Sequence, residues 1–436
     1  MKVTYKKKFL IDINRLLSVR TSAGVLVYTL VISILTLVFL LGFLQLFLLS
    51  NREKLTLMSE DKKEDILQSG IEFLLSANLN CTDTVFNITL FENDEHEHYL
   101  KQERYGLFDI ITSTLVWRGD SLNRNRLIAN CKKSDQTCLI SGSSTFSLKI
   151  GGDALLEGDV EISEKGIERA YVGGKTYTRD SLVFGNIKLL NHSIPELSKE
   201  IAKINSKNFI NFSHAEILLY SNENLVNQKR NFNQTILIIA SKNEMNIDSD
   251  SISGKCVIKS EKSITIGKNA FLENVILSAP KIIIEDNFEG CIQLIASDTI
   301  IIGKNVKLRY PSAVFINQSE STEVNPLLEI GEDTKIQGLV IIIQGKKVLQ
   351  KQIIMPVLSV GLNAEITGQV YSTGNVYQRG LINGSLVCKQ LVDLSSGVNE
   401  SLLIDGKISK RKMPSFFPEF GVWGNYNQKT ILKCLE

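Results

Sequence analysis

The sequence predicts a mainly β protein with a long N-terminal transmembrane helix followed by a right-handed parallel β-helix, a solenoid of short stacked strands. Two observations predict this fold class. Short apolar runs rich in β-branched residues recur at an interval of 18 residues in the second half of the chain. Near the N-terminus, residues 23–50 form an apolar run without a charged residue.

The repeat is clearest in three phrases, SITIGKN at 263–269, KIIIEDN at 281–287 and TIIIGKN at 299–305. Their β-branched runs are typical of strands, and the Gly, Asn and Asp residues that end them are typical of tight turns. The positions that recur in register are Ile266, Ile284, Ile302 and Asn269, Asn287, Asn305. A unit of this length fits one coil of a parallel β-helix.

Stacking of the coils explains both rows. Neighbouring coils lie about 4.8 Å apart, so each residue meets its equivalent in the next coil. The Ile row then packs on itself as a dry interior, and replacing Ile283 or Ile301 by Asp is expected to bury an unpaired charge. Asn tolerates left-handed backbone angles, and stacked Asn side chains can hydrogen-bond to one another. We predict a corner ladder, and a ligand-binding role for the Asn row is the alternative.

Related phrases extend the predicted β-helix over residues 145–410, with an insertion at about 170–232 where the rhythm breaks. Examples are IGGDALL at 150–156, IGEDTKI at 330–336 and VGLNAEI at 360–366. In these phrases the chain resembles the bactofilin-like, polymer-forming cytoskeletal proteins. The resemblance covers about half of the chain and implies a β-helical architecture.

The apolar run at 23–50 is long enough to cross a bilayer, because about 20 helical residues span the hydrocarbon core. Residues 1–22 carry six Lys or Arg residues and one Asp, and a basic head of this kind stays in the cytoplasm. We therefore predict a retained single-pass anchor in the inner (cytoplasmic) membrane, in contact with the lipid bilayer. The chain beyond residue 51 is then periplasmic or otherwise extracytoplasmic.

Residues 51–80 are predicted to extend the helix, with apolar residues such as Ile71 and Leu74 at helical spacing. The basic head, the apolar helix and the phrase LQSGIEFLLS resemble the N-terminal region of PilX-like minor pilins and general-secretion pseudopilins. The resemblance implies pilin-like or secretion-system membrane proteins as partners. Thr29 departs from the major-pilin pattern, which has Glu at this place.

Two further segments border the predicted solenoid. Residues 81–144 are predicted to form a small β-rich cap over the first coil, since an open end would expose unpaired strand edges. Residues 411–436 are rich in aromatic side chains and are predicted to cap the last coil. The anchor, the cap and the solenoid together resemble a family of single-pass membrane proteins of Bacteroidota.

The cysteines and histidines admit alternative interpretations. Cys131 and Cys138 bracket a polar turn and could close a short disulfide loop in an oxidising compartment. His96 and His98 lie in the acidic stretch ENDEHEHY. A metal site is one interpretation of that stretch, and a solvated acidic loop is the one that we favour.

No catalytic motif stands out. The sequence contains no HExxH, P-loop or GxSxG motif, and the acidic residues near the repeats do not recur in one register. We therefore expect no enzyme activity, no catalytic residues, no cofactor and no metal. The formal net charge of +2 argues against a nucleic-acid partner.

The predicted function is that of a membrane-anchored extracytoplasmic structural or interaction protein, associated with a type IV pilus-like or secretion-type envelope assembly. Two alternatives are a surface glycan-binding adhesin module, with cell-envelope glycans as partners, and a bactofilin-like self-polymerising scaffold.

Overall fold

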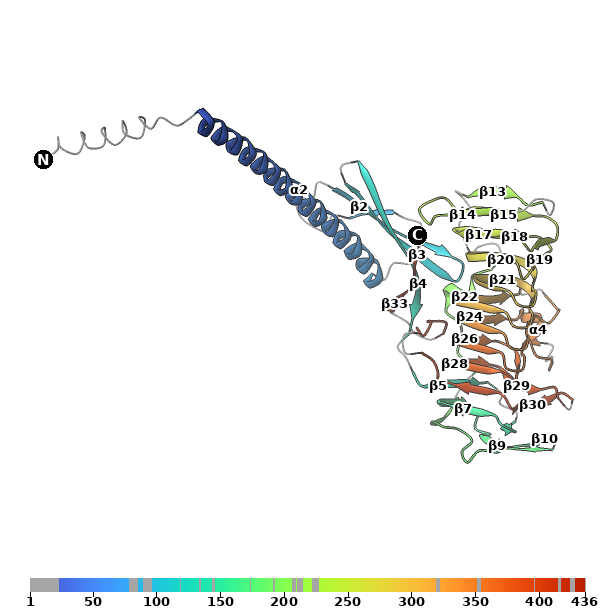
Figure 1. The fold of residues 1–436 in the computed structure, drawn as a ribbon. Coiled ribbons are helices and arrows are strands. Elements are labelled where there is room, and N and C mark those ends of the chain that lie inside the picture. Colours follow the sequence, from blue (N-terminus) through green and yellow to red (C-terminus); the bar gives the residue numbers. More distant parts are fainter. Residues whose placement is uncertain are drawn as a thin grey trace. The chain divides into compact units, whose positions relative to one another are not determined.

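The structure is a computed structural model of the 436-residue chain. It describes residues 23–77, 85–88, 96–117, 119–132, 135–142, 146–172, 174–190, 193–205, 209, 215–221, 227–318, 322–350, 354–395, 397–414, 417–423 and 428–435. The predicted cytoplasmic head at 1–22 lies outside the described residues. The chain is mainly β with one long apolar N-terminal helix, as the sequence predicts (Figure 1).

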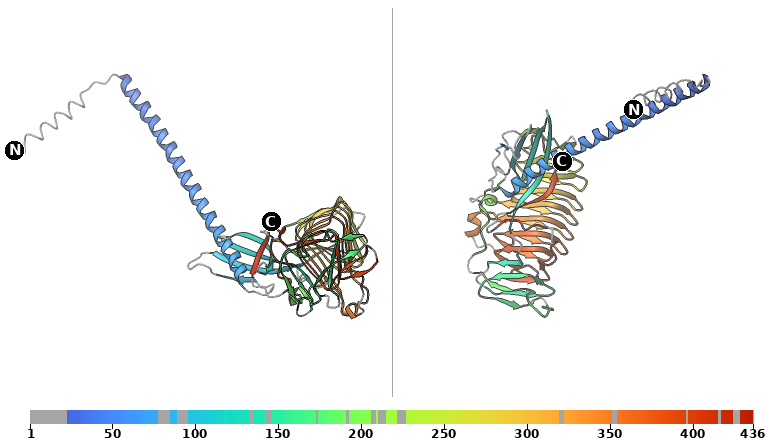
Figure 2. Two further views of the ribbon diagram at one scale, coloured as in Figure 1. Left: turned by 90° about the horizontal axis from the view of Figure 1, so that it is seen from below. Right: turned by 90° about the vertical axis from the view of Figure 1, so that its left-hand side faces the viewer.

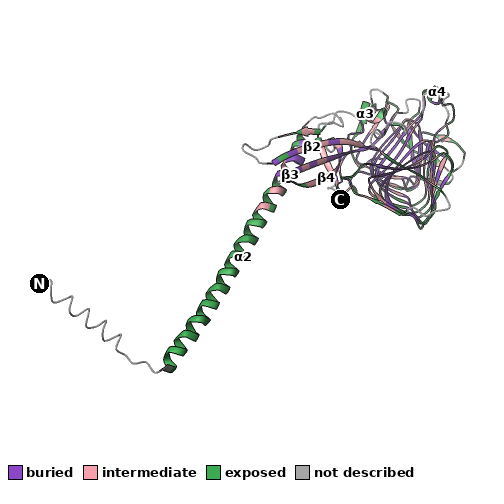
Figure 3. Cartoon of the chain, turned by 90° about the horizontal axis from the view of Figure 1, so that it is seen from above, coloured by how far each residue is buried: buried purple, intermediate pink, exposed green. Residues whose placement is uncertain are grey.

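The chain divides into two compact units, Met1–Ile66 and Leu67–Glu436. Helix α2 (Ala23–Ser76) begins in the first unit. Its residues 24–58 are exposed throughout (Figure 3). Among the described residues it is the one helix long and apolar enough to cross a membrane. No Pro occurs before Pro195, so nothing in the sequence breaks the backbone hydrogen bonding of this helix.

The second unit is built around a large set of parallel strands, here called the parallel stack. Its strands are β5 (Thr137–Ser141), β7 (Leu155–Glu157), β8 (Asp159–Ile162), β12 (Ile187–Leu189), β13 (Glu216–Leu219), β14 (Asn227–Arg230), β15 (Leu237–Ser241), β16 (Met245–Ile247), β17 (Ser251–Gly254), β18 (Cys256–Ser260), β19 (Ser263–Ile266), β20 (Phe271–Ile284), β21 (Glu289–Ile302), β22 (Lys307–Asn317), β23 (Leu327–Ile330), β24 (Lys335–Ile343), β25 (Leu358–Val360), β26 (Glu365–Ser372), β27 (Asn375–Gln378), β28 (Leu381–Cys388), β29 (Gln390–Asp393) and β32 (Lys407–Ser409).

Smaller elements accompany the stack. Strand β30 (Asn399–Glu400) pairs antiparallel with β29. Strands β31 (Leu402–Ile404), β6 (Leu148–Gly151) and β9 (Ile167–Arg169) form a three-stranded parallel sheet, and β10 (Tyr171–Val172) and β11 (Lys175–Thr176) form a hairpin. Two short helices, α3 (Lys199–Ala202) and α4 (Lys346–Gln350), lie in connections.

One inward row of side chains fixes the order of the stack. Each residue in the row pairs with the next: Leu218, Ile239, Ile258, Leu277, Leu294, Val314, Val340, Val370, Leu386, Leu139, Val160 and Ile187. The order in space is therefore not the order in the chain, because Leu139 follows Leu386. Figures 1 and 2 show the strands of residues 137–190 continuing the stack beyond β28.

This order corrects the predicted boundaries of the β-rich body. The body was expected to begin at residue 145 and to contain an insertion at 170–232. The structure instead places strands β5, β12 and β13 in the stack itself. Among the described residues, the end strands β12 and β13 pair on one side only, and their apolar residues are exposed. Their sequences therefore lack the contrast between buried and exposed positions that marks an internal strand.

The segment from 193 to 209, here called the strap, lies on the outer face of the stack. The Tyr371 hydroxyl donates to the Pro195 carbonyl oxygen at 2.9 Å, and the Asn317 amide donates to the Ile204 carbonyl oxygen at 2.5 Å. Farther along the chain, the Gly106 N–H donates to the Phe209 carbonyl oxygen at 3.2 Å. The strap thus runs from the rung of Val370, on β26, to the rung of Val314, on β22, in the direction of β13.

A five-stranded antiparallel sheet covers the same outer face. Its order is β1 (Val85–Asn87), β2 (His96–Tyr105), β3 (Phe108–Trp117), β4 (Asp120–Cys131) and β33 (Gln428–Leu435). An apolar layer joins this sheet, the strap and the tail to the stack, and it includes Phe108, Phe209, Phe315, Phe420 and Trp423.

Neither predicted cap is at an end of the stack. Of the segment 81–144, the strands β2, β3 and β4 lie against the side of the stack and β5 belongs to the stack itself, and the tail contributes β33 to the sheet instead of plugging the last repeat. The reason is the outward row of the stack, which is apolar over six consecutive rungs and needs a cover: Ile295, Phe315, Ile341, Tyr371, Val387 and Ile140.

The interior side of the same strands forms the main core, which runs the length of the stack. Side chains alternate in and out along a strand. Ile282 and Ile284 are therefore buried, whereas Ile283 is half-buried on the outer side. The expectation that Asp at Ile283 or Ile301 would bury a charge in the interior was wrong, because the inward residues are their neighbours Ile284 and Ile302.

The corrected register gives a stability prediction. Ile284→Asp places a carboxylate between Ile266 and Ile302, where neither water nor a cation can reach it. We expect it to lower the free energy of unfolding by about 4 kcal/mol or more. The measurement is urea unfolding followed by far-UV circular dichroism. Ile283→Asp is the matched control, and equal losses in the two variants would show that the inward row is misassigned.

Candidate functional site

The predicted Ile ladder is part of the core. Ile266 pairs with Ile284, and Ile284 pairs with Ile302. All three side chains are buried. Their chemistry is limited to packing, and they offer nothing to a ligand.

The predicted Asn row lies at the corners of the stack. Asn287 and Asn305 have φ angles of 67° and 54°, in the left-handed region that Asn tolerates. The Asn305 side-chain amide donates to the Asn287 side-chain oxygen at 2.8 Å. Asn269 makes a different contact, donating to the Asp248 carboxylate at 3.4 Å. Asp333 and Asn363 take up left-handed angles at later corners, which the sequence phrases IGEDTKI and VGLNAEI could have indicated.

Cys131 and Cys138 are both buried free thiols, so the disulfide considered for them is absent from the structure. Their side chains lie in different apolar layers. Cys138 faces the interior of the stack, and Cys131 faces the layer under the sheet. Burial raises the pKa of Cys138 to about 12 and also raises the pKa of Cys131, so neither thiol is a nucleophile at neutral pH.

A cavity of about 460 Å³ lies beside these cysteines, and we call it the charged pocket. Three segments that are distant in the chain line it: 131–136, 410–419 and 428–430. Its charged lining residues are Lys132, Asp135, Lys410, Arg411 and Glu419. Its apolar lining residues include Met413, Pro414, Phe417 and Pro418.

Two of the charged lining residues form a buried ion pair. The Lys410 ammonium lies 2.5 Å from the Glu419 carboxylate, and the two side chains are 5% and 3% exposed. Lys132 lies 2.7 Å from Asp135 and 3.8 Å from Glu419. The Lys132 ammonium also lies 4.9 Å from the centroid of the Trp423 ring. Burial would raise the pKa of Asp135, but the hydrogen bond and charge of Lys132 lower it on balance.

The pocket can hold an anionic group beside an apolar one. Its three cations outnumber its two carboxylates, and Arg411 is exposed at the rim. Arg is suited to bidentate hydrogen bonding with a carboxylate. Sequence reasoning missed this pocket because its charged residues come from separate segments and share no motif.

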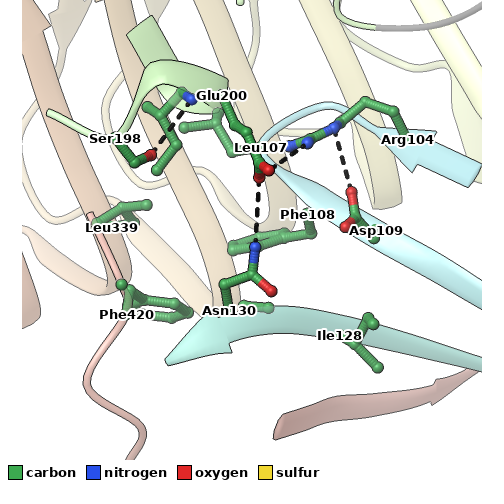
Figure 4. A pocket seen from close by; sticks show the side chains of 13 residues that line it. Arg104, Leu107, Phe108, Asp109, Ile128, Asn130, Ser198, Glu200, Leu339 and Phe420 are labelled. Carbon is green, nitrogen blue, oxygen red and sulfur yellow. Dashed lines mark hydrogen bonds and ion pairs between the residues drawn. The ribbon is translucent and has the colours of Figure 1, made fainter. Parts of the chain in front are cut away.

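A second polar cluster lies under the strap (Figure 4). Arg104 lies 3.1 Å from Asp109 and 3.8 Å from Glu200 of α3, and Asn130 donates to Glu200 at 3.4 Å. The cavity that these residues line measures about 20 Å³. That volume holds no more than about one water molecule, so the cluster ties the strap to the sheet and does not bind a ligand.

Residues 96–99 of the acidic stretch belong to strand β2, so the predicted solvated loop is wrong for them, and residues 92–95 lie outside the described residues. His96 stacks on Trp117, with ring centroids 5.1 Å apart. His98 Nε2 lies 2.8 Å from the Ser113 hydroxyl. Within the part of the chain that the structure describes, no three His, Cys, Asp or Glu side chains are grouped to hold a metal.

The buried ion pair gives a second prediction. Lys410→Met removes the cation nearest to Glu419 and is expected to lower the free energy of unfolding by about 3 kcal/mol. Adding Glu419→Gln should recover most of that loss, because a neutral amide costs less to bury. Urea unfolding of both variants measures this, with the exposed neighbour changed in Lys412→Met as control. An unchanged free energy of unfolding in Lys410→Met would contradict the ion pair with Glu419.

No family model and no curated protein matches this chain. Among solved structures, the chain is similar to the crystal structure of the competence-associated pilin ComZ from Thermus thermophilus, at 10% sequence identity. The match covers 86% of this chain and 95% of that chain, with a TM-score of 0.23. A TM-score this low supports no conclusion about fold or function.

Proposed function

We propose that this protein is a membrane-anchored structural or interaction protein whose body lies outside the cytoplasm. In this proposal α2 crosses the inner membrane once, with residues 1–22 in the cytoplasm. The parallel stack is a right-handed parallel β-helix that presents a rigid surface. The protein has no catalytic role.

The observation that carries this proposal is the division of α2 into two chemically different parts. Residues 24–50 are apolar and exposed, with no protein surface to cover them. Residues 66–75 of the same helix place Ile71 and Leu74 in a packed apolar cluster with the antiparallel sheet. An apolar helix that needs lipid and continues into a folded body is the arrangement of a single-pass anchor.

Partners in the membrane follow from the resemblance of this helix to pilin-like sequences. Helices associate in lipid through close packing at small residues. Gly24 and Gly42 leave open space on the surface of α2, since a Cβ at either position meets nothing within 4 Å. We propose pilin-like or secretion-system membrane proteins as the helices that pack there.

The topology can be tested with a native residue. Cys434 is exposed, whereas the other cysteines among the described residues are buried. In a Cys81→Ser background, since Cys81 lies outside the described residues, a membrane-impermeant maleimide should label Cys434 in cells whose outer membrane has been permeabilised, and adding Cys434→Ser should remove the label. Labelling that requires lysis of the inner membrane would place the body in the cytoplasm and end the proposal.

A crosslinking experiment identifies the partners. A photo-crosslinking amino acid at Phe43, which is 69% exposed in the apolar run, should capture pilin-like or secretion proteins in cells. The same probe at Met58, beyond the predicted span, is the control. Recovery of this chain alone would favour a self-polymerising scaffold resembling bactofilins.

The charged pocket favours a second candidate function, which is binding of an acidic envelope glycan. The acid of a uronic sugar would meet Arg411, and the sugar ring would lie against Phe417 and the prolines. Trigalacturonate is a suitable probe, and neutral maltotriose is its control. Arg411→Ala should weaken trigalacturonate binding about tenfold, since a charge-assisted hydrogen bond contributes about 1.4 kcal/mol. Equal binding of the two sugars by calorimetry would reject this candidate.

A further inference from the structure

The last turns of α2 approach strand β2 unusually closely at Gly70. A Cβ added to Gly70 would lie 2.5 Å from Cε1 and 2.6 Å from Nε2 of His98, and 2.7 Å from a methyl carbon of Leu100. Real side chains do not tolerate such distances, so Gly70 allows the helix to lie directly on the imidazole ring. Ile71 and Leu74 pack with Leu100, Ile111 and Ile128 beside it.

The surroundings of the His98 ring favour its neutral form. Its side chain is 1% exposed. Nε2 lies 2.8 Å from the Ser113 hydroxyl, and Nδ1 has no hydrogen-bond partner among the described residues. In the neutral ring, Nε2–H can donate a hydrogen bond to the Ser113 hydroxyl, and Nδ1 then carries a lone pair and needs no acceptor. A second proton would sit on Nδ1 as a buried donor without an acceptor, which is costly.

We propose that His98 makes the docking of residues 67–76 onto the antiparallel sheet sensitive to pH, so that protonation of the ring releases these helical turns. The neutral ring fills the space under Gly70. The imidazolium must gain water, and water reaches it only when the helix lifts from the sheet.

Among the residues that the structure describes, no carboxylate is placed to compensate the imidazolium. From β2 the nearest titratable group is His96, which would repel it. Residues 67–76 contain one ionisable residue, Glu72, and it is exposed. From β3 the facing group is the Ser113 hydroxyl, while Asp109 contacts Arg104 and Gln102. From β33, Lys429 donates to the carbonyl oxygens of Leu74 and Ala77 at the end of the helix and adds a further positive charge.

The direction of the pH effect follows from linkage. Burial, and then the charge of His96, lowers the pKa of His98 below its ordinary value of 6.5. The undocked form therefore binds the proton more tightly than the docked form. Docking is fully stable above about pH 6.5 and weakens as pH falls below it, about tenfold for each unit of difference between the two pKa values.

Amide hydrogen exchange on the full chain in lipid nanodiscs tests this inference. After correction for the intrinsic pH dependence of exchange, residues 67–76 should exchange at least about tenfold faster at pH 5.0 than at pH 7.5. Peptides from β21 and β22 in the stack should not change. His98→Gln keeps a hydrogen-bonding side chain but cannot take a proton, so it should abolish the acceleration. His96→Gln is the matched control and should retain it.

A second measurement covers the case in which His98→Gln does not fold. Exchange of the imidazole C2 hydrogen, followed by mass spectrometry of the unmodified protein, gives the pKa of each histidine separately. A value for His98 clearly below 6.5 supports the inference. An ordinary value, an unchanged exchange rate in residues 67–76, or equal acceleration in His98→Gln would overturn it. None of these outcomes depends on whether α2 crosses a membrane.

Discussion

The pairing of β28 with β5 is the constraint on which the second unit depends. Leu386 pairs with Leu139, although the two residues belong to opposite halves of the chain, and the inward row continues through this joint without a polar interruption. Since β12 ends the stack on one side and β13 begins it on the other, the chain between them must return over eleven strand spacings, about 53 Å. The strap exists because of this return. The apolar outward row exists because the strap, the sheet and the tail cover it.

The antiparallel sheet contacts the end of α2 on one face and the stack on the other, and specific hydrogen bonds fix its position on the stack. At the β2–β3 turn, the Gln293 side chain accepts a hydrogen bond from the Leu107 N–H at 2.9 Å and donates to the Tyr105 carbonyl oxygen at 3.1 Å. Gly106, at φ 68°, lies so close to Gln293 that an added Cβ would clash with the Gln293 side-chain oxygen. On the other face of the sheet, Lys429 satisfies the last carbonyl groups of α2, whose orphan acceptors would otherwise be buried.

Local pattern predicted much of this fold, and long-range pairing accounts for what it did not predict. The recurrence of Ile266, Ile284 and Ile302 indicated both strands and stacking, because each residue meets its own equivalent. The apolar run at 23–50 indicated the helix by composition alone. No local sequence pattern, however, indicates that the strand of Leu139 pairs with the distant strand of Leu386. The same limit applies to the charged pocket, where Lys410 and Glu419 meet Lys132 from the other end of the chain, and to Cys131 and Cys138, whose separation into two layers depends on which faces of the stack are covered.

The joint between β28 and β5 also has a consequence for assembly of the chain during synthesis. Strands β5 and β8 pair with each other and emerge early, yet β28, which pairs with the other edge of β5, emerges near the end, so that apolar edge stays unpaired through most of translation and export. Parallel pairing between distant segments is intrinsically slow. When several copies are anchored side by side, β5 of one copy can pair with β28 of a neighbouring copy as well as with its own β28. The segment from 137 to 189 is therefore the part of this chain most exposed to domain swapping, and intermolecular exchange there would join two bodies without any new interface.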